Sequence, residues 1–88
     1  MLKNSADELL RREARYLSMR RSTRELETIL SDFFEREWMG MDGKTRMEFL
    51  KILRQEDADL ERYLFKNQPP SPELCRALVE KLRAHIPK

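Results

Sequence analysis

Apolar residues recur early in the chain at the spacing of one helical face. The positions of this first stripe are Leu10, Ala14 and Leu17, supported by Leu9 and Tyr16. Their i, i+4, i+7 pattern is typical of an amphipathic helix with one buried side. Ser5 and Glu8 have the spacing of a capping box, in which each side chain satisfies a backbone amide of the first turn. We therefore expect the first helix to begin near Ala6 and to end at about Arg20.

A second and stronger stripe follows after a polar break. Its members are Leu26, Ile29, Leu30, Phe33 and Phe34. We expect this helix to be central to the core, because it carries the densest apolar face in the chain. Ser22 and Glu25 repeat the capping-box spacing just before it, which predicts that Ser22 starts a second helix. That helix is expected to end between Trp38 and Gly40.

The middle of the chain predicts two shorter helices. Asp42 is the expected N-cap of the third helix. The apolar positions of that helix are Met47, Leu50 and Leu53, with Phe49 and Ile52 widening the face. After a break at residues 55–56, Asp57 and Asp59 favour the positive end of a fourth helix dipole. The apolar positions of that helix are Leu60, Tyr63 and Leu64.

Two prolines separate the fourth helix from a fifth. Residues 67–70 contain Pro69 and Pro70, which interrupt a helix because proline lacks a backbone N–H. Ser71 before Pro72 matches a cap followed by proline at the first helical position, so the fifth helix is expected to start there and to end at Pro87. Its apolar positions are Leu74, Leu78, Leu82 and Ile86.

These patterns predict an all-α fold, a small five-helix bundle formed by residues 1–88 as one domain. No run alternates apolar and polar residues long enough to predict a strand. A chain of 88 residues buries only roughly 60–65% of the surface that it exposes when unfolded. The core is therefore expected to be thin.

Charge is abundant but nearly balanced. Charged residues make up 39% of the chain and the net charge is +2, which is too little to require a nucleic-acid partner. Positive charge is nevertheless concentrated locally, because Glu13 is the only acidic residue between Arg11 and Arg24. The arginines of this segment are Arg11, Arg12, Arg15, Arg20, Arg21 and Arg24.

The sequence gives no sign of export or of membrane insertion. The chain contains one cysteine, Cys75, and therefore no internal disulfide, as suits a reducing compartment. The N-terminus has no apolar run of the kind found in secretory signals, and nowhere do about 18 apolar residues follow one another. We expect a cytoplasmic protein.

No arrangement of residues predicts catalysis. The chain has no metal-ligand cluster, no phosphate-binding glycine loop and no nucleophile motif, so we expect that it is not an enzyme. His85 and Cys75 are expected to be structural, at a helix end and at the edge of the core. Asp57 and Asp59 superficially resemble the start of a calcium loop, but the glycine and glutamate of that motif are missing. Helix capping is their expected role, and partner contact by Asp59 stays open.

The segment from Arg20 to Glu27, with the sequence RRSTRELE, admits two interpretations. In the first, the arginines form a solvated edge and Glu25 completes a helix cap. In the second, guanidinium groups beside a helix N-terminus form a surface that recognises carboxylates or phosphates of a partner. The two interpretations are compatible.

This segment carries a resemblance to a known family. RRSTRELE followed by ILSDFFE resembles the region around the R-G-x-x-E motif of the succinate dehydrogenase assembly factor 2 family, whose bacterial members are small five-helix proteins. The acidic DADL segment before an aromatic residue and the proline break before a final helix also match. The resemblance extends from about Arg15 to Leu82.

The resemblance implies a chaperone-like assembly factor. Members of this family bind the flavoprotein subunit of succinate dehydrogenase, and in bacteria also that of fumarate reductase, and promote covalent attachment of FAD. The flavin and the histidine that carries it belong to the client, so we expect no cofactor of the protein's own. We further expect no nucleic-acid partner and a monomer when the protein is free.

The same resemblance implies the interface residues. Arg21 and Glu25 match their motif positions, but Ser22 stands where the family has glycine. Serine is also accepted at N-caps, although its hydroxymethyl group could weaken the contact or select a different client. The expected partner-binding residues are Arg20, Arg21, Ser22, Arg24, Glu25 and Asp59.

Two other function classes fit parts of the sequence. A serine-capped helix after an arginine-rich helix superficially resembles a helix-turn-helix layout in a nucleic-acid-binding module. The second helix, however, is filled with apolar residues and leaves few polar side chains to read base edges. An antitoxin-like regulatory role is the other alternative.

Overall fold

The computed structural model describes residues 5–86, which form five α-helices and a short 3-10 turn. The elements in chain order are α1 (Ser5–Met19), α2 (Arg24–Glu37), η1 (Trp38–Gly40), α3 (Gly43–Leu53), α4 (Asp57–Phe65) and α5 (Arg76–Ala84). No strand occurs within residues 5–86. The predicted all-α, five-helix fold is confirmed.

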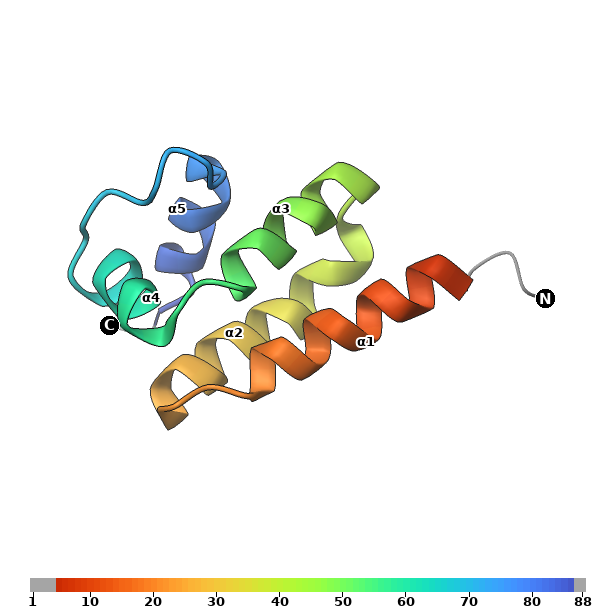
Figure 1. The fold of residues 1–88 in the computed structure, drawn as a ribbon, viewed down its shortest axis with the longest axis horizontal. Helices are drawn as coiled ribbons and strands as arrows, with labels where there is room; N and C mark the ends of the chain where they lie inside the picture. The colour runs from red at the N-terminus through yellow and green to blue at the C-terminus, as the bar shows by residue number, and fades with distance from the viewer. Residues whose placement is uncertain (1–4, 87–88) are drawn as a thin grey trace.

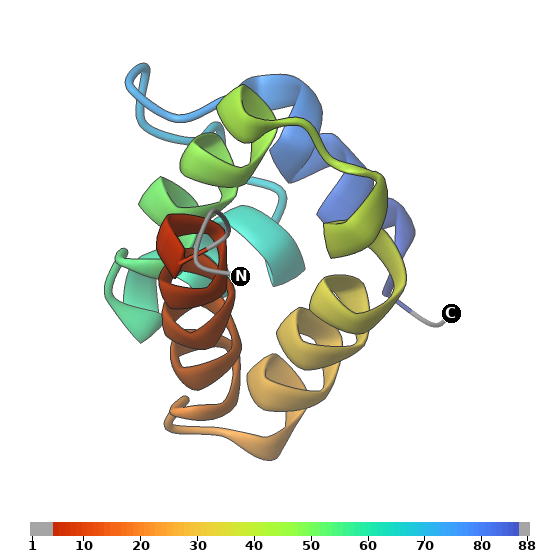
Figure 2. The same cartoon turned by 90° about the vertical axis from the view of Figure 1, so that its right-hand side faces the viewer.

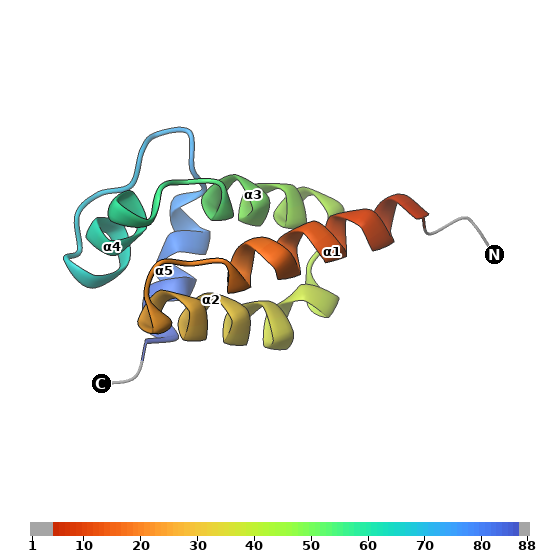
Figure 3. The ribbon, with the colours of Figure 1, turned by 60° about the horizontal axis from the view of Figure 1, so that its bottom comes forward.

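The helices enclose one interior. In Figure 1, α1 and α2 run side by side in opposite directions, α3 lies along them, and α4 and α5 gather at one end. The view along α1 in Figure 2 shows α1, α2, α3 and α5 around a shared centre. The first turns of α1 project beyond the ends of α2 and α3, as Figures 1 and 3 both show. That end of α1 therefore has few neighbours.

All five helices contribute to the buried centre. The largest contribution comes from α2, as its stripe predicts. Aromatic rings pack against one another at tilted angles in this centre. The ring centroids of Phe33 and Phe49 are 5.4 Å apart, and those of Phe34 and Trp38 are 5.3 Å apart. The core cluster consists of Ala14, Leu26, Leu30, Phe33, Phe34, Trp38, Phe49, Leu50, Ile52, Leu53, Leu60, Leu64, Leu74, Leu78, Val79 and Leu82.

Helix boundaries agree with the sequence for α1, α3 and α4. Asp42 caps α3 as predicted, because its carboxylate accepts a hydrogen bond of 2.8 Å from the Thr45 amide. The Ser5 side chain of the predicted first capping box lies outside the described part of the structure. Its proposed partner Glu8 forms ion pairs with Arg11 and Arg12.

The predicted start of α2 is wrong by one residue. Thr23 is the N-cap, with its hydroxyl accepting from the Leu26 amide at 3.1 Å. Ser22 does not cap, because its own amide donates to Asp57 in α4. Glu25 therefore occupies the second helical position rather than the third, where a capping box requires its carboxylate.

The predicted start of α5 is also wrong. Ser71 begins a single turn, closed by a bond from the Leu74 amide to the Ser71 carbonyl. Cys75 then has extended backbone, and the helix begins at Arg76. The turn still buries Leu74 in the core. Pro87, the predicted end of the helix, lies outside the described residues.

Three apolar positions do not lie where the stripes placed them. Leu9, Tyr16 and Met47 are 64%, 56% and 45% exposed. Leu9 and Tyr16 are only supporting members of the first stripe, and they lie on the exposed side of α1. Met47 is a main position of its stripe, so its predicted burial is wrong.

Candidate docking surface

The loop between α1 and α2 is fixed from inside by Arg21. Its side chain is only 8% exposed, and its Nε lies 3.1 Å from Oδ1 of Asp57, at the start of α4. Its Nη1 donates to the carbonyl of Leu53 at the end of α3, at 3.1 Å. One guanidinium thus joins the loop to the junction of α3 and α4, and we call this contact the Arg21–Asp57 clasp.

The two carboxylate oxygens of Asp57 have different contacts in the clasp. The Arg21 Nε–H points to the carbonyl of Arg20 at 3.3 Å, so Asp57 Oδ1 is held by charge and has no hydrogen-bond donor among the described residues. The other oxygen, Oδ2, accepts from the Ser22 amide at 2.6 Å. Asp57 therefore binds both residues that precede the α2 cap.

The environment of Asp57 favours its ionised form. Burial acts to raise its pKa, but the hydrogen bond from Ser22 and the positive charge of Arg21 outweigh it, so that the pKa of Asp57 lies below its ordinary value. The carboxylate is consequently charged near neutral pH and keeps the loop in place.

The residues around the clasp divide into an inner and an outer set. Arg21 turns inward, whereas the other residues predicted for the loop and first turn of α2 are exposed. We call this outer set the docking surface; it consists of Arg20, Ser22, Arg24 and Glu25. The structure thus brings four of the six predicted residues together on one accessible edge.

Glu25 lies in the first turn of α2, where its charge favours the helix dipole, but it makes no contact that would commit its side chain. The capping interpretation fails, because Thr23 caps the helix and Asp57 takes the Ser22 amide. Glu25 makes no ion pair within the described part of the chain, and neither does Arg24. Both charges are available to a partner.

Arg20 is held in position although it is exposed. Its Nη1 donates to the Tyr16 hydroxyl at 2.7 Å, and its guanidinium lies over the Tyr16 ring, 5.1 Å from the centroid. A cation held over an aromatic face loses less side-chain entropy when a partner carboxylate binds it. This arrangement was not predicted, although the i, i+4 spacing of the two residues permits it.

Asp59, the sixth predicted residue, lies apart from this edge in the first turn of α4. Its carboxylate forms an ion pair with Arg62 one turn later. Sequence reasoning missed Asp57 and Thr23 as the residues that build the loop. The acidic start of α4 was a signal for Asp57, but its partner 35 residues away was not visible in any local pattern.

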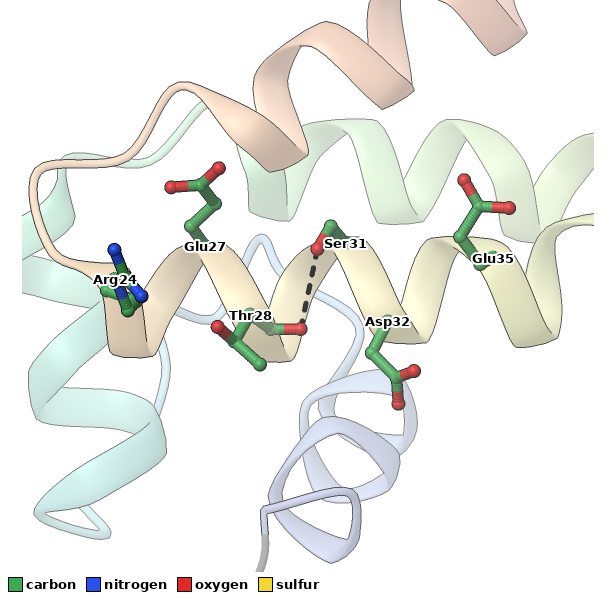
Figure 4. A pocket seen from close by; sticks show the side chains of 6 residues that line it. All are labelled: Arg24, Glu27, Thr28, Ser31, Asp32 and Glu35. Atoms are coloured by element: carbon green, nitrogen blue, oxygen red, sulfur yellow. Dashed lines mark hydrogen bonds between the residues drawn. The ribbon is translucent and has the colours of Figure 1, made fainter.

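A hollow of about 490 Å³ borders the docking surface along α2 and begins at Arg24. Figure 4 shows that its side chains spread rather than converge: Glu27 and Glu35 extend to one side of the helix and Asp32 to the other. Asp32 is already bound to His85, at 3.0 Å from Nε2. This hollow is an acidic, shallow face and does not enclose a small molecule.

The two remaining candidate residues, His85 and Cys75, pack against the core. His85 stands at the end of α5 and packs edge-on against Phe33. Cys75 is half-buried against the core. Within residues 5–86 no three His, Cys, Asp or Glu side chains are grouped to hold a metal ion.

Comparison with known proteins supplies the family. The sequence matches the family described as flavinator of succinate dehydrogenase over residues 12–86. The chain belongs to this family. The match covers the clasp, the docking surface and all of the helices from Arg12 of α1 onward, and it confirms the resemblance drawn from RRSTRELE. No curated protein and no solved structure matches the chain.

The structure also addresses membrane insertion directly. None of the helices within residues 5–86 has the length and apolar content that crossing a bilayer requires.

Proposed function

We propose that this protein is an assembly factor that binds the flavoprotein subunit of succinate dehydrogenase and promotes covalent attachment of FAD to it. The observation that carries this proposal is the match to the flavinator family over residues 12–86. The flavoprotein subunit of fumarate reductase is a second client within the same proposal. The docking surface is the part of the protein that we propose meets the client.

The protein acts by positioning and contributes no reactive group. The flavin and the residue that carries it are the client's, and the assembly factor holds the client in a geometry that favours bond formation. We propose accordingly that it is not an enzyme, has no cofactor of its own, works in the cytoplasm and is a monomer when free. The docking surface supports this role because it offers charges for recognition and no nucleophile or metal site.

Arg21 has a different role from its neighbours in this proposal. It is a positioning residue, because its side chain is buried and acts on the loop through Asp57 and Leu53. Arg20, Ser22, Arg24 and Glu25 make the contacts. Asp59 stays a candidate contact from α4.

The serine in place of the family's glycine is compatible with the loop. Glycine is needed where φ is positive, and among the described residues other than glycine only Asn67 has a positive φ. Ser22 therefore fits its backbone without strain, and its exposed side chain alters only the surface that a client meets.

A nucleic-acid partner is less compatible with α2. Its inner side is committed to the core, and its outer side carries Glu25, Glu27, Asp32 and Glu35. Carboxylates facing outward repel phosphates, which supply much of the affinity in nucleic-acid complexes.

Co-expression tests the proposed function. A candidate flavoprotein subunit is produced in cells that lack their own assembly factor, with and without this protein, and covalent flavin is measured by fluorescence on a denaturing gel. We expect covalent flavin to rise when the protein is present. Unchanged fluorescence with every flavoprotein subunit tested would contradict the proposal.

A matched pair of variants locates the surface. Glu25→Ala and Glu35→Ala each remove one exposed carboxylate from α2, and only Glu25 belongs to the docking surface. We expect Glu25→Ala to lower covalent flavin severalfold and Glu35→Ala to leave it unchanged. Equal effects of the two variants would contradict the assignment.

A further inference from the structure

The outer side of α1 is unusual for a helix that packs on one face. Ala14 and Ser18 are buried against the rest of the protein. The opposite side carries three large exposed hydrophobic residues, which are Leu9 at 64%, Tyr16 at 56% and Met19 at 45% exposure. Arginines alternate with them. We call this set the outer face of α1; it consists of Leu9, Arg12, Arg15, Tyr16, Met19 and Arg20.

This clustering is not a general property of the surface. Among the described residues, the other large exposed hydrophobics are Met39 and Met47, which lie on η1 and α3. Isolated exposed apolar residues need no explanation, but a group on one helix face marks an interaction site. Helical periodicity places residues 9, 16 and 20 on neighbouring turns of one side.

The composition of the face is that of a protein interface. Tyrosine, methionine and arginine are enriched at the centres of interfaces, where they supply most of the binding energy. Tyr16 is already ordered by its contact with Arg20, and Arg15 makes no ion pair with any described residue. Part of the entropic cost of binding is thus met before a partner arrives.

The face is also continuous with the docking surface. Arg20 belongs to both, because it stacks on Tyr16 within α1 and directly precedes the clasped loop. A partner bound at Ser22 and Glu25 therefore meets Tyr16 and Met19 next along the chain. The charges of the docking surface are exposed, and exposed ion pairs alone contribute little affinity.

We infer that the outer face of α1 supplies the apolar centre of the client interface, with Tyr16 and Met19 as its principal contacts. The inference rests on the proposed function. The complementary surface on the flavoprotein subunit is an apolar side chain beside carboxylates, because Arg15 and Arg20 adjoin the apolar residues here and form no ion pair with a described residue. Arg12 is paired with Glu8 on its own helix. Leu9, which is nearest the N-terminal end of α1, is at the edge of this face.

An anionic membrane fits this face less well. Helices that lie on membranes separate a wide apolar side from a basic side. Here arginines lie between the apolar residues, so no wide apolar strip is available for insertion.

Two equally exposed methionines provide a controlled test. Met19 and Met47 are each 45% exposed, but only Met19 lies on the outer face of α1. The Kd of the intact protein for the purified flavoprotein subunit is measured for Met19→Ser, Tyr16→Ser and Met47→Ser, with helicity checked by circular dichroism. We expect the first two to weaken binding roughly tenfold and Met47→Ser to change it less than about twofold.

The outcomes separate the inference from the function on which it rests. If the wild-type protein binds and both Met19→Ser and Tyr16→Ser bind equally well, the inference is wrong and the proposed function stands. If the wild-type protein does not bind any flavoprotein subunit, both the inference and the proposed function are wrong. Binding to vesicles of phosphatidylserine and phosphatidylcholine that is lost in Tyr16→Ser, with an unchanged Kd for the flavoprotein, would assign the face to membranes instead.

Two further variants test the chemistry of the face. Tyr16→Phe removes only the hydroxyl that binds Arg20 and is expected to retain most of the affinity, because the ring makes the contact. Arg15→Gln is expected to reduce the salt dependence of Kd, since it removes one charge facing the carboxylates. A salt dependence that Arg15→Gln leaves unchanged would contradict the acidic partner surface.

Discussion

Two loops of this protein are each held by one arginine, and they lead to different surfaces. Arg21 fixes the loop between α1 and α2 through Leu53 and Asp57. Arg83 fixes the loop after α4 by donating to the carbonyls of Tyr63 and Gln68, at 2.7 Å each. The side chains of Arg21 and Arg83 are both largely buried, with exposed fractions of 8% and 17%.

The two loops differ in the residues that they leave exposed to solvent. The loop before α5 sends Leu74 into the core, and its exposed residues include Pro69 and Pro72. The loop before α2 and the first turn of that helix leave Ser22, Arg24 and Glu25 exposed, and within residues 5–86 neither Arg24 nor Glu25 forms an ion pair. A largely buried arginine therefore indicates a scaffold in both places. Exposed charges without an ion pair among the described residues lie beside both loops, because Lys66 and Glu73 near the second loop are also exposed and unpaired. The surface that we propose for docking is therefore distinguished by the match of Arg21 and Glu25 to the family motif, and not by unpaired charge alone.

Removing the two arginines gives the largest expected effects. Arg21→Ala leaves the Asp57 carboxylate partly buried without its counter-charge, which is expected to lower the free energy of unfolding by about 2 to 3 kcal/mol. Covalent flavin in the client should fall with it, because the loop is released. Thermal unfolding and the co-expression assay measure the two quantities.

Arg83→Ala is the matched control for that variant. It is expected to destabilise the protein by about 1 to 2 kcal/mol through the two lost hydrogen bonds to carbonyls and the lost ion pair with the exposed Glu80, while covalent flavin stays near the wild-type level at temperatures where the protein is folded. If Arg83→Ala lowers flavinylation as much as Arg21→Ala, stability alone explains both and the distinction between the loops is wrong.

The cap of α2 gives an intermediate effect. Thr23→Ala removes the hydroxyl that binds the Leu26 amide and should cost about 1 kcal/mol. Ser22→Ala should change stability by less than about 0.5 kcal/mol, because its backbone amide, and not its hydroxyl, is bound by Asp57. The free energy of unfolding of both variants is measured by chemical denaturation. A larger loss of stability in Ser22→Ala than in Thr23→Ala would show that Ser22 is the cap, as the sequence predicted.

The smallest effect at neutral pH concerns the protonation of Asp57. Its folded pKa lies below the ordinary value of 3.8, so the unfolded chain takes up a proton first as the pH falls. The contribution of the clasp is therefore complete above about pH 4 and is lost as the pH falls through the folded pKa. Asp57→Asn should flatten the acid side of the stability profile, and an unchanged acid slope in this variant would contradict the charge contact.

Local sequence patterns predicted much of the fold. The stripes located all five helices, and Asp42 and Asp57 marked the starts of α3 and α4 correctly. The pattern failed where a distant residue intervened. Ser22 and Glu25 have the spacing of a capping box, but Asp57 binds the Ser22 amide across 35 positions, and Thr23 becomes the cap.

The candidate site could be predicted only in part for the same reason. The arginine-rich segment indicated where the surface lies, but the inward turn of Arg21 depends on the carbonyl of Leu53 and on Asp57, both contributed by other helices. Contacts of this kind have no period along the chain.

The bond from the Ser22 amide to Asp57 has a consequence for how this protein can change. The main chain at position 22 is anchored by a remote carboxylate, so nearly any small side chain can be exchanged there without rebuilding the turn. Such a position is suited to adjusting preference between related clients. A library at residue 22 alone is therefore a direct way to retune the client preference that we propose.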